Sequence, residues 1–101
     1  MAKRIVWTRK ACLDIIAILE YWQRRNKSNT YSKKLNKLFV QSVLIISKYP
    51  EIGKRTDIEN VRVKIIKEYL VFYEIIGQEI IVLTIIDGRR DPSLLLKGIT
   101  K

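Results

Sequence analysis

The spacing of apolar residues predicts two helices in the first half of the chain. Apolar residues recur at intervals of three and four after Thr8, which is typical of one helical face and predicts a helix over residues 9–26 with Thr8 as N-cap. A second helix is predicted over residues 30–49, ending before Pro50. The expected buried stripes are Cys12, Ile15, Ile16, Leu19 and Trp22, then Leu35, Leu38, Phe39, Ser42, Ile45, Ile46 and Tyr49.

The second half of the chain has the pattern of β-strands. Val61 and Val63 alternate with Arg62 and Lys64, which predicts a strand over residues 61–66 with one buried and one wet face. Residues 69–76 and 79–86 are rich in β-branched and aromatic side chains and predict two more strands. Gly77 begins a two-residue turn between them, as in a type II′ hairpin. A polar loop is expected between residues 50 and 60.

A short strand over residues 3–8 precedes the first helix, so the predicted order is β-α-α-β-β-β. This order predicts an α+β fold, an antiparallel sheet with an N-terminal helical hairpin packed on one face, because neither helix can bury its stripe alone. The first strand is expected beside a strand that does not follow it in sequence. A chain of 101 residues is expected to form one domain.

Composition narrows the functional classes. The chain is 48% apolar, which argues against disorder, yet no apolar run reaches the roughly 18 residues of a membrane span. No signal peptide is recognisable, so a cytoplasmic protein that does not engage membranes is expected. With no His, acid–base catalysis by His is excluded, and no metal or other cofactor is expected. Cys12 is the single cysteine, expected to pack within the first stripe.

The net charge of +10 is concentrated in the first half of the chain. Residues 1–49 carry 11 Lys and Arg but only Asp14 and Glu20, whereas residues 50–101 are nearly balanced. A basic surface of this kind attracts nucleic acid or an acidic protein partner. Lys33, Lys34 and Lys37 are predicted on the outer surface of the second helix, where they form a solvated face or contact a target or nucleic acid.

Five short stretches, in the same order as the predicted elements, carry a family resemblance. They are WT at 7–8, YPEIGK at 49–54, VRV at 61–63, YLVFYEI at 69–75 and IDGRRDP at 86–92. Together they resemble the RelE/ParE superfamily of toxins from bacterial type II toxin–antitoxin systems. The resemblance implies a small basic α+β toxin that a cognate antitoxin holds inactive by wrapping around it.

The superfamily contains two activities, so the resemblance leaves the target open. RelE-like members cleave messenger RNA on the ribosome, and ParE-like members poison DNA gyrase. For a nuclease, the resemblance implies catalytic roles for Arg62, Lys64, Arg89 and Arg90. Tyr69 and Tyr73 then become acids or base-stacking groups, or alternatively simple packing residues. The candidate bases are Glu51, Asp57 and Glu59.

Two features favour the gyrase-poisoning branch. Leu70 stands where RelE-like enzymes commonly have an arginine, and the residues after Pro92, SLLLKGITK, include neither Tyr nor His. The main hypothesis is therefore a ParE-like gyrase inhibitor. The alternatives are a RelE-like endoribonuclease and a non-toxic nucleic-acid-binding or degenerate toxin module. The oligomeric state is not readable from the sequence.

Overall fold

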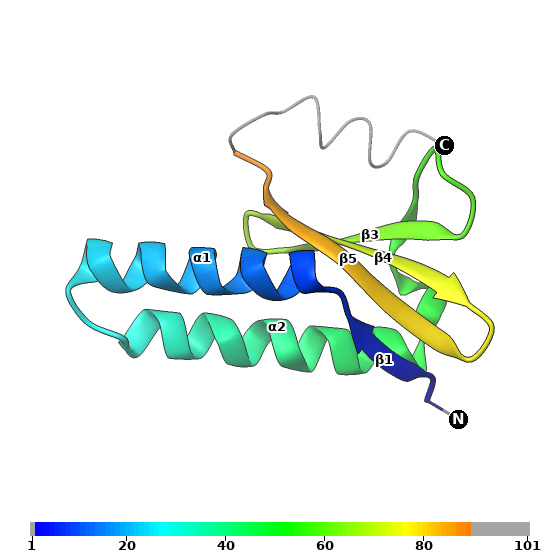
Figure 1. The fold of residues 1–101 in the computed structure, drawn as a ribbon, viewed down its shortest axis with the longest axis horizontal. Helices are drawn as coiled ribbons and strands as arrows, with labels where there is room; N and C mark the ends of the chain where they lie inside the picture. The colour runs from blue at the N-terminus through cyan, green and yellow to red at the C-terminus, as the bar shows by residue number, and fades with distance from the viewer. Residues whose placement is uncertain (1, 90–101) are drawn as a thin grey trace.

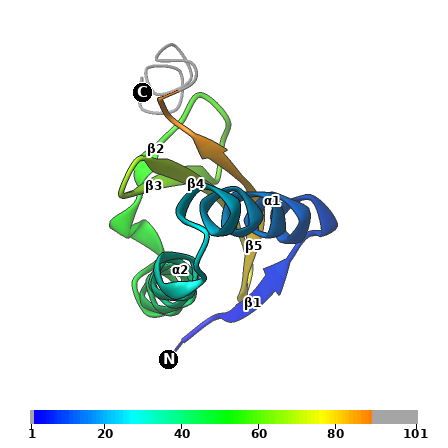
Figure 2. The same ribbon diagram turned by 90° about the vertical axis from the view of Figure 1, so that its left-hand side faces the viewer.

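Two helices pack on one face of a five-stranded sheet (Figures 1 and 2). The computed structural model describes residues 2–89. The predicted α+β class and the helical hairpin on one face of the sheet are confirmed. In chain order the elements are β1 (Arg4–Trp7), α1 (Arg9–Asn26), α2 (Thr30–Lys48), the 3-10 helix η1 (Pro50–Ile52), β2 (Lys54–Arg55), β3 (Val61–Ile66), β4 (Tyr69–Ile76) and β5 (Glu79–Asp87).

The strand order across the sheet is β1-β5-β4-β3-β2. Strands β3, β4 and β5 form the predicted antiparallel meander, and β1 lies beside the non-sequential strand β5. The sheet is mostly antiparallel as predicted, and β1, whose direction was not predicted, runs parallel to β5. The helical hairpin returns the chain to the end of the sheet where β1 begins, as the bond from the Lys3 N–H to the Ser47 carbonyl shows. Three alternating strands then leave β5 running in the direction of β1.

The segment between α2 and β3 has more structure than the expected polar loop. It contains η1 and the two-residue strand β2, which pairs with β3 and forms an edge of the sheet. Lys54 and Arg55 are both exposed and offer no apolar alternation from which a strand could be predicted. Short, charged edge strands of this kind resist pairing with other chains.

The buried face of α1 differs from the predicted stripe. Ala11 is fully buried, and Ile15, Ile18 and Trp22 pack against the core. Cys12 and Ile16 are exposed, so both were wrongly placed in the stripe, and Cys12 does not have the expected packing role. Ala11 is the one buried residue of α1, so the face that meets the sheet is centred on a small side chain and not on the predicted stripe.

The buried line on α2 is formed by Leu35, Phe39, Val43 and Ile46. The sequence predicted three of these four residues and missed Val43. Ile45 and Tyr49 were wrongly expected in the stripe, since they are 47% and 65% exposed.

Each turn of the meander has two residues and begins with a positive φ. Gly77 has φ +54°, as the predicted β4–β5 turn requires. In the β3–β4 turn this position is held by Lys67, with φ +58°. A side chain in this left-handed region is strained, whereas glycine adopts it readily.

Replacing Lys67 by Gly is therefore expected to raise the free energy of unfolding by about 0.5–1 kcal/mol, the relief of strain less the entropy that glycine loses on folding. Urea titration of purified protein measures the change. The matched control is Lys67→Ala, which removes the same charge but keeps a Cβ atom. Equal stabilisation by both variants would attribute the gain to charge and contradict the prediction.

Within residues 2–89, no helix is long and apolar enough to cross a membrane.

Candidate functional site

Arg62 and Lys64 share one face of β3, as their spacing predicted. Directly paired residues of an antiparallel sheet point to the same side. Arg62 is opposite Tyr73, and Lys64 is opposite Val71. Both partners belong to the clusters that pack beneath the helices. The two cations are only partly exposed, on the helix-covered side of the sheet.

The Arg62 guanidinium is held by the loop that contains η1. It donates hydrogen bonds to the backbone carbonyls of Glu51 at 3.2 Å and Gly53 at 2.8 Å. Both bonds come from Nη1, so these carbonyls occupy the N–H donors of one of the three guanidinium nitrogens. Lys64 makes no hydrogen bond or ion pair with any residue that the structure describes, so its ammonium group is the less engaged of the two cations.

Tyr73 holds the same loop from beneath. Its ring is fully buried, and its hydroxyl donates to the Pro50 carbonyl at 2.6 Å and accepts from the Gly53 N–H at 3.0 Å. Burial raises the pKa of the phenol, while the bond from Gly53 and the charge of Arg62 oppose the rise. In this conformation Tyr73 presents no ring surface on which a base could stack.

A hollow of about 530 Å³ is lined by residues between Glu51 and Arg62, together with Ile75 of β4. Glu51, Glu59 and Arg62 line it together with Arg55, so the structure brings two of the candidate bases close to one candidate cation. The third candidate base, Asp57, is exposed in the loop before β3 and is not among the lining residues. Neither Lys64 nor Arg89 lines this hollow.

Tyr69 belongs to an aromatic cluster between the helices and the sheet. Its hydroxyl accepts a hydrogen bond from the Trp22 indole N–H at 2.7 Å, and its ring meets Phe39 edge to face. Trp22 also packs edge to face against Tyr21 and Tyr31. The Tyr69 side chain is buried, and burial raises the pKa of its phenol.

Arg89 lies at the end of β5 and is bound to neighbouring acids. Its guanidinium donates to both carboxylate oxygens of Asp87, lies 3.8 Å from Glu68 and approaches the Trp22 ring at 5.9 Å. The hydrogen bond to Asp87 raises the pKa of Arg89. A local ion pair is therefore present, although such exposed pairs contribute little stability. Arg90 lies outside the described residues.

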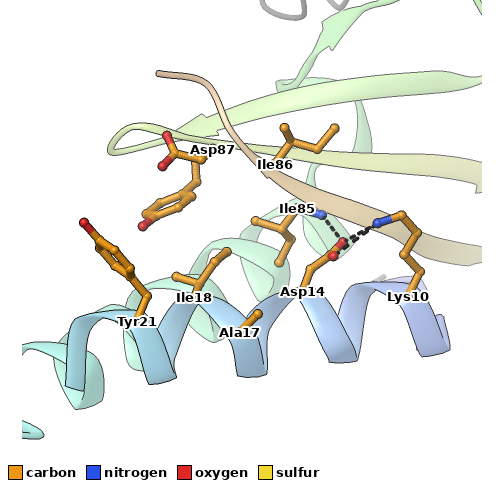
Figure 3. A pocket seen from close by; sticks show the side chains of 9 residues that line it. Lys10, Asp14, Ala17, Ile18, Tyr21, Ile85, Ile86 and Asp87 are labelled. Atoms are coloured by element: carbon orange, nitrogen blue, oxygen red, sulfur yellow. Dashed lines mark hydrogen bonds and ion pairs between the residues drawn. The ribbon is translucent and has the colours of Figure 1, made fainter. Parts of the chain in front are cut away.

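A cleft of about 340 Å³ between α1 and β5 was not predicted (Figure 3). Ala17, Ile18 and Ile85 give it an apolar floor. Asp14 projects from α1 toward β5, where its carboxylate accepts from the Thr84 hydroxyl, the Ile85 N–H and the Lys10 ammonium. Tyr21, Tyr69, Ile86 and Asp87 complete the lining.

Asp14 bonds polar groups on an edge of β5 that no neighbouring strand covers. Strand β1 ends at Trp7, opposite Val82, so the following residues of β5 lack a neighbour on that side. Thr8 donates to the Val82 and Leu83 carbonyls, and Asp14 accepts from the next residues along the strand. Burial alone would raise the pKa of Asp14, but the hydrogen bonds from Thr84, Ile85 and Lys10 outweigh it and lower the pKa. Asp14 lies outside the stripe predicted for this helix, yet it contacts the sheet.

The candidate catalytic residues do not converge on one point among residues 2–89. Arg62 lies opposite Tyr73, whereas Arg89 lies beside Tyr69, four residues away along β4 or about 13 Å. Each guanidinium is bonded to a different part of the protein. Over the same residues, no three His, Cys, Asp or Glu side chains are placed to hold a metal ion.

Comparison with known proteins identifies the family. Residues 5–92 match the family described as the ParE toxin of type II toxin-antitoxin system, parDE. The chain belongs to the ParE toxin family. No curated protein sequence matches it significantly.

Two solved structures share the fold of this ParE-family toxin. One is the chromosomal ParDE toxin–antitoxin system from P. aeruginosa, with a TM-score of 0.70 and 22% identity over 83% of this chain and 94% of the other. The second is a mutant of the E. coli toxin RelE in the free state, with a TM-score of 0.57 and 14% identity over 97% and 95% of the two chains. At these identities the likeness concerns the fold alone, and the target must be argued from the residues.

Proposed function

We propose that this ParE-family toxin arrests bacterial growth by inhibiting DNA gyrase in the cytoplasm and is neutralised by a cognate antitoxin. The main support for this proposal is that the residues which RNA cleavage would need are bonded to other parts of the protein. Cleavage requires cations and an acid–base pair around one phosphate. Here Arg62 is bonded to loop carbonyls, Arg89 to Asp87, and the Tyr73 hydroxyl to the same loop as Arg62.

The surface of the helical hairpin supports an antitoxin partner. Large apolar side chains are exposed on both helices, and a protein surface with several such groups is suited to an amphipathic segment of a partner. The basic first half of the chain favours an acidic segment. The exposed apolar residues on the two helices are Leu13, Ile16, Tyr21, Val40, Leu44 and Ile45.

Inducible expression in a bacterial host tests the proposal, with messenger RNA integrity and gyrase-linked DNA breaks measured in the same culture. We expect growth arrest, DNA breaks and intact message, and relief of the arrest when the antitoxin gene is co-expressed. Lys64→Ala, with Lys67→Ala as a control for charge loss, is expected to leave the arrest unchanged. Lys64 is preferred to Arg62 here because it holds no loop in place.

Two other outcomes identify the alternative functions. Cleavage within translated codons that Lys64→Ala abolishes would establish the ribosome-dependent endoribonuclease and refute gyrase inhibition. The endoribonuclease stays a candidate because Lys64 is partly exposed and makes no hydrogen bond or ion pair within residues 2–89. Normal growth with intact message and unchanged gyrase activity would indicate a degenerate module.

A further inference from the structure

We propose that the tip of the helical hairpin is a binding site for the phosphate backbone of duplex DNA. The hairpin tip comprises residues 24–37, which are the end of α1, the turn and the first half of α2. In Figure 1 the turn between the helices extends beyond the sheet, on the side opposite the β4–β5 turn. The tip can therefore approach an extended ligand without obstruction by the sheet.

The charge of the tip has one sign. It carries six exposed cations, and no acidic residue occurs between Glu20 and Glu51. The ion pairs found among residues 2–89 join Arg4, Lys10 and Arg89 to acids elsewhere, and none involves the tip. The cations of the tip are Arg24, Arg25, Lys27, Lys33, Lys34 and Lys37.

The remaining surface of the tip favours nucleic acid over a protein partner. Protein interfaces rely on apolar and aromatic residues at their centre and are poor in Lys. Within the described chain, no large apolar side chain between residues 22 and 39 is exposed. The residues between the cations include exposed Ser28, Asn29 and Thr30, whose side chains are types that contact phosphates and sugars in DNA complexes.

The dimensions of the tip indicate how it contacts DNA. A single helix with its side chains is about 10–12 Å wide, and two packed helices are too wide for a major groove of about 12 Å. The tip therefore rests on phosphates without reading bases, and its binding is independent of sequence and weakened by salt. This site goes beyond gyrase inhibition and does not depend on it.

Fluorescence anisotropy of the purified full chain with labelled duplexes tests the site. We expect two duplexes of unrelated sequence to bind equally, with affinity falling steeply between about 50 and 200 mM salt. The variant Lys33→Gln/Lys34→Gln/Lys37→Gln should weaken binding at least tenfold at low salt, and it should reduce the slope of log affinity against log salt by about 3.

Two matched variants make the result specific. Lys48→Gln/Lys54→Gln/Lys67→Gln removes the same charge from exposed positions outside the tip and should have a much smaller effect. Lys33→Arg/Lys34→Arg/Lys37→Arg keeps the charge and should retain binding. Equal losses from both Gln variants would overturn the proposal in favour of diffuse attraction. Unchanged DNA binding with weakened antitoxin binding by the tip variant would overturn it in favour of a protein interface.

Discussion

Replacing Tyr73 by Phe is expected to lower the free energy of unfolding by about 2–4 kcal/mol. The phenol oxygen bonds the Pro50 carbonyl and the Gly53 N–H, and its removal leaves both backbone groups without this buried partner. Each buried polar group left unpaired costs about 1–3 kcal/mol. Phe keeps the ring and therefore leaves the packing of β4 against α2 intact. Urea unfolding of the two proteins measures the difference.

Gly53→Ala tests the same contact from the other side. A Cβ atom on Gly53 would lie 2.6 Å from the Tyr73 oxygen and 3.0 Å from the Val63 carbonyl, so the hydroxyl would have to leave its position. Overpacking of this kind costs about 1–3 kcal/mol. If the loop contact is the shared cause, Tyr73→Phe/Gly53→Ala should destabilise by less than the two single changes added together. Strict additivity would contradict this interpretation.

Tyr73→Phe also distinguishes a structural role of the Tyr73 hydroxyl, in holding the loop, from a catalytic role as an acid. If Tyr73 only holds the loop, the folded variant should arrest growth as fully as the wild type once expression is raised to match the amount of folded protein. A nuclease in which Tyr73 supplies the acid would instead lose message cleavage while the protein stays folded. Circular dichroism of the purified variant establishes the folded fraction on which the comparison depends.

The strands of the meander could be predicted because their pattern is local. Val61, Arg62, Val63 and Lys64 alternate, and a positive φ is required at Gly77, so neighbouring residues contain the information. The buried face of α1 was harder to predict from the sequence, because apolar side chains occur around much of this helix. Leu13 and Ile16 are about half exposed, whereas the small Ala11 is buried. Hydrophobic spacing alone could not decide which stripe meets the sheet.

The roles of the candidate site residues depended on partners far away in the sequence. Arg62 bonds a loop that precedes it by nine or more residues, and Tyr73 bonds residues 20 and 23 positions earlier. A sequence pattern shows that Arg62 and Tyr73 have polar atoms but not where those atoms are satisfied. The aromatic cluster was equally hidden, since the Trp22–Tyr69 bond joins residues 47 positions apart. The sequence did contain a signal that Asp14 faces the sheet, because Ala11, Asp14 and Ile18 recur at helical spacing and so share one face of α1.

Replacing Asp14 by Asn is expected to lower the free energy of unfolding by about 1–2 kcal/mol at neutral pH. The carboxylate accepts hydrogen bonds from Thr84, Ile85 and Lys10, and an amide has one oxygen with which to replace them. Hydrogen bonds to a charged group are worth about 1.5–3 kcal/mol, which partial exposure and salt reduce. Because these bonds join α1 to the edge of β5 that β1 does not cover, the loss should also increase amide exchange at Ile85.

The pH dependence identifies the charged form of Asp14 as the stabilising one. Its pKa in the folded protein lies below the ordinary value of 3.8, so the carboxylate stabilises the fold above that value. The contribution falls as the pH drops through the lower folded pKa. The stability difference between wild type and Asp14→Asn should therefore stay constant from neutral pH to about pH 5 and shrink below pH 4. A stability difference that persists undiminished at pH 2 would show that the shape of the Asn side chain, and not the lost charge, causes the destabilisation. The double variant Asp14→Asn/Thr84→Val would then test whether the contact with Thr84 is responsible.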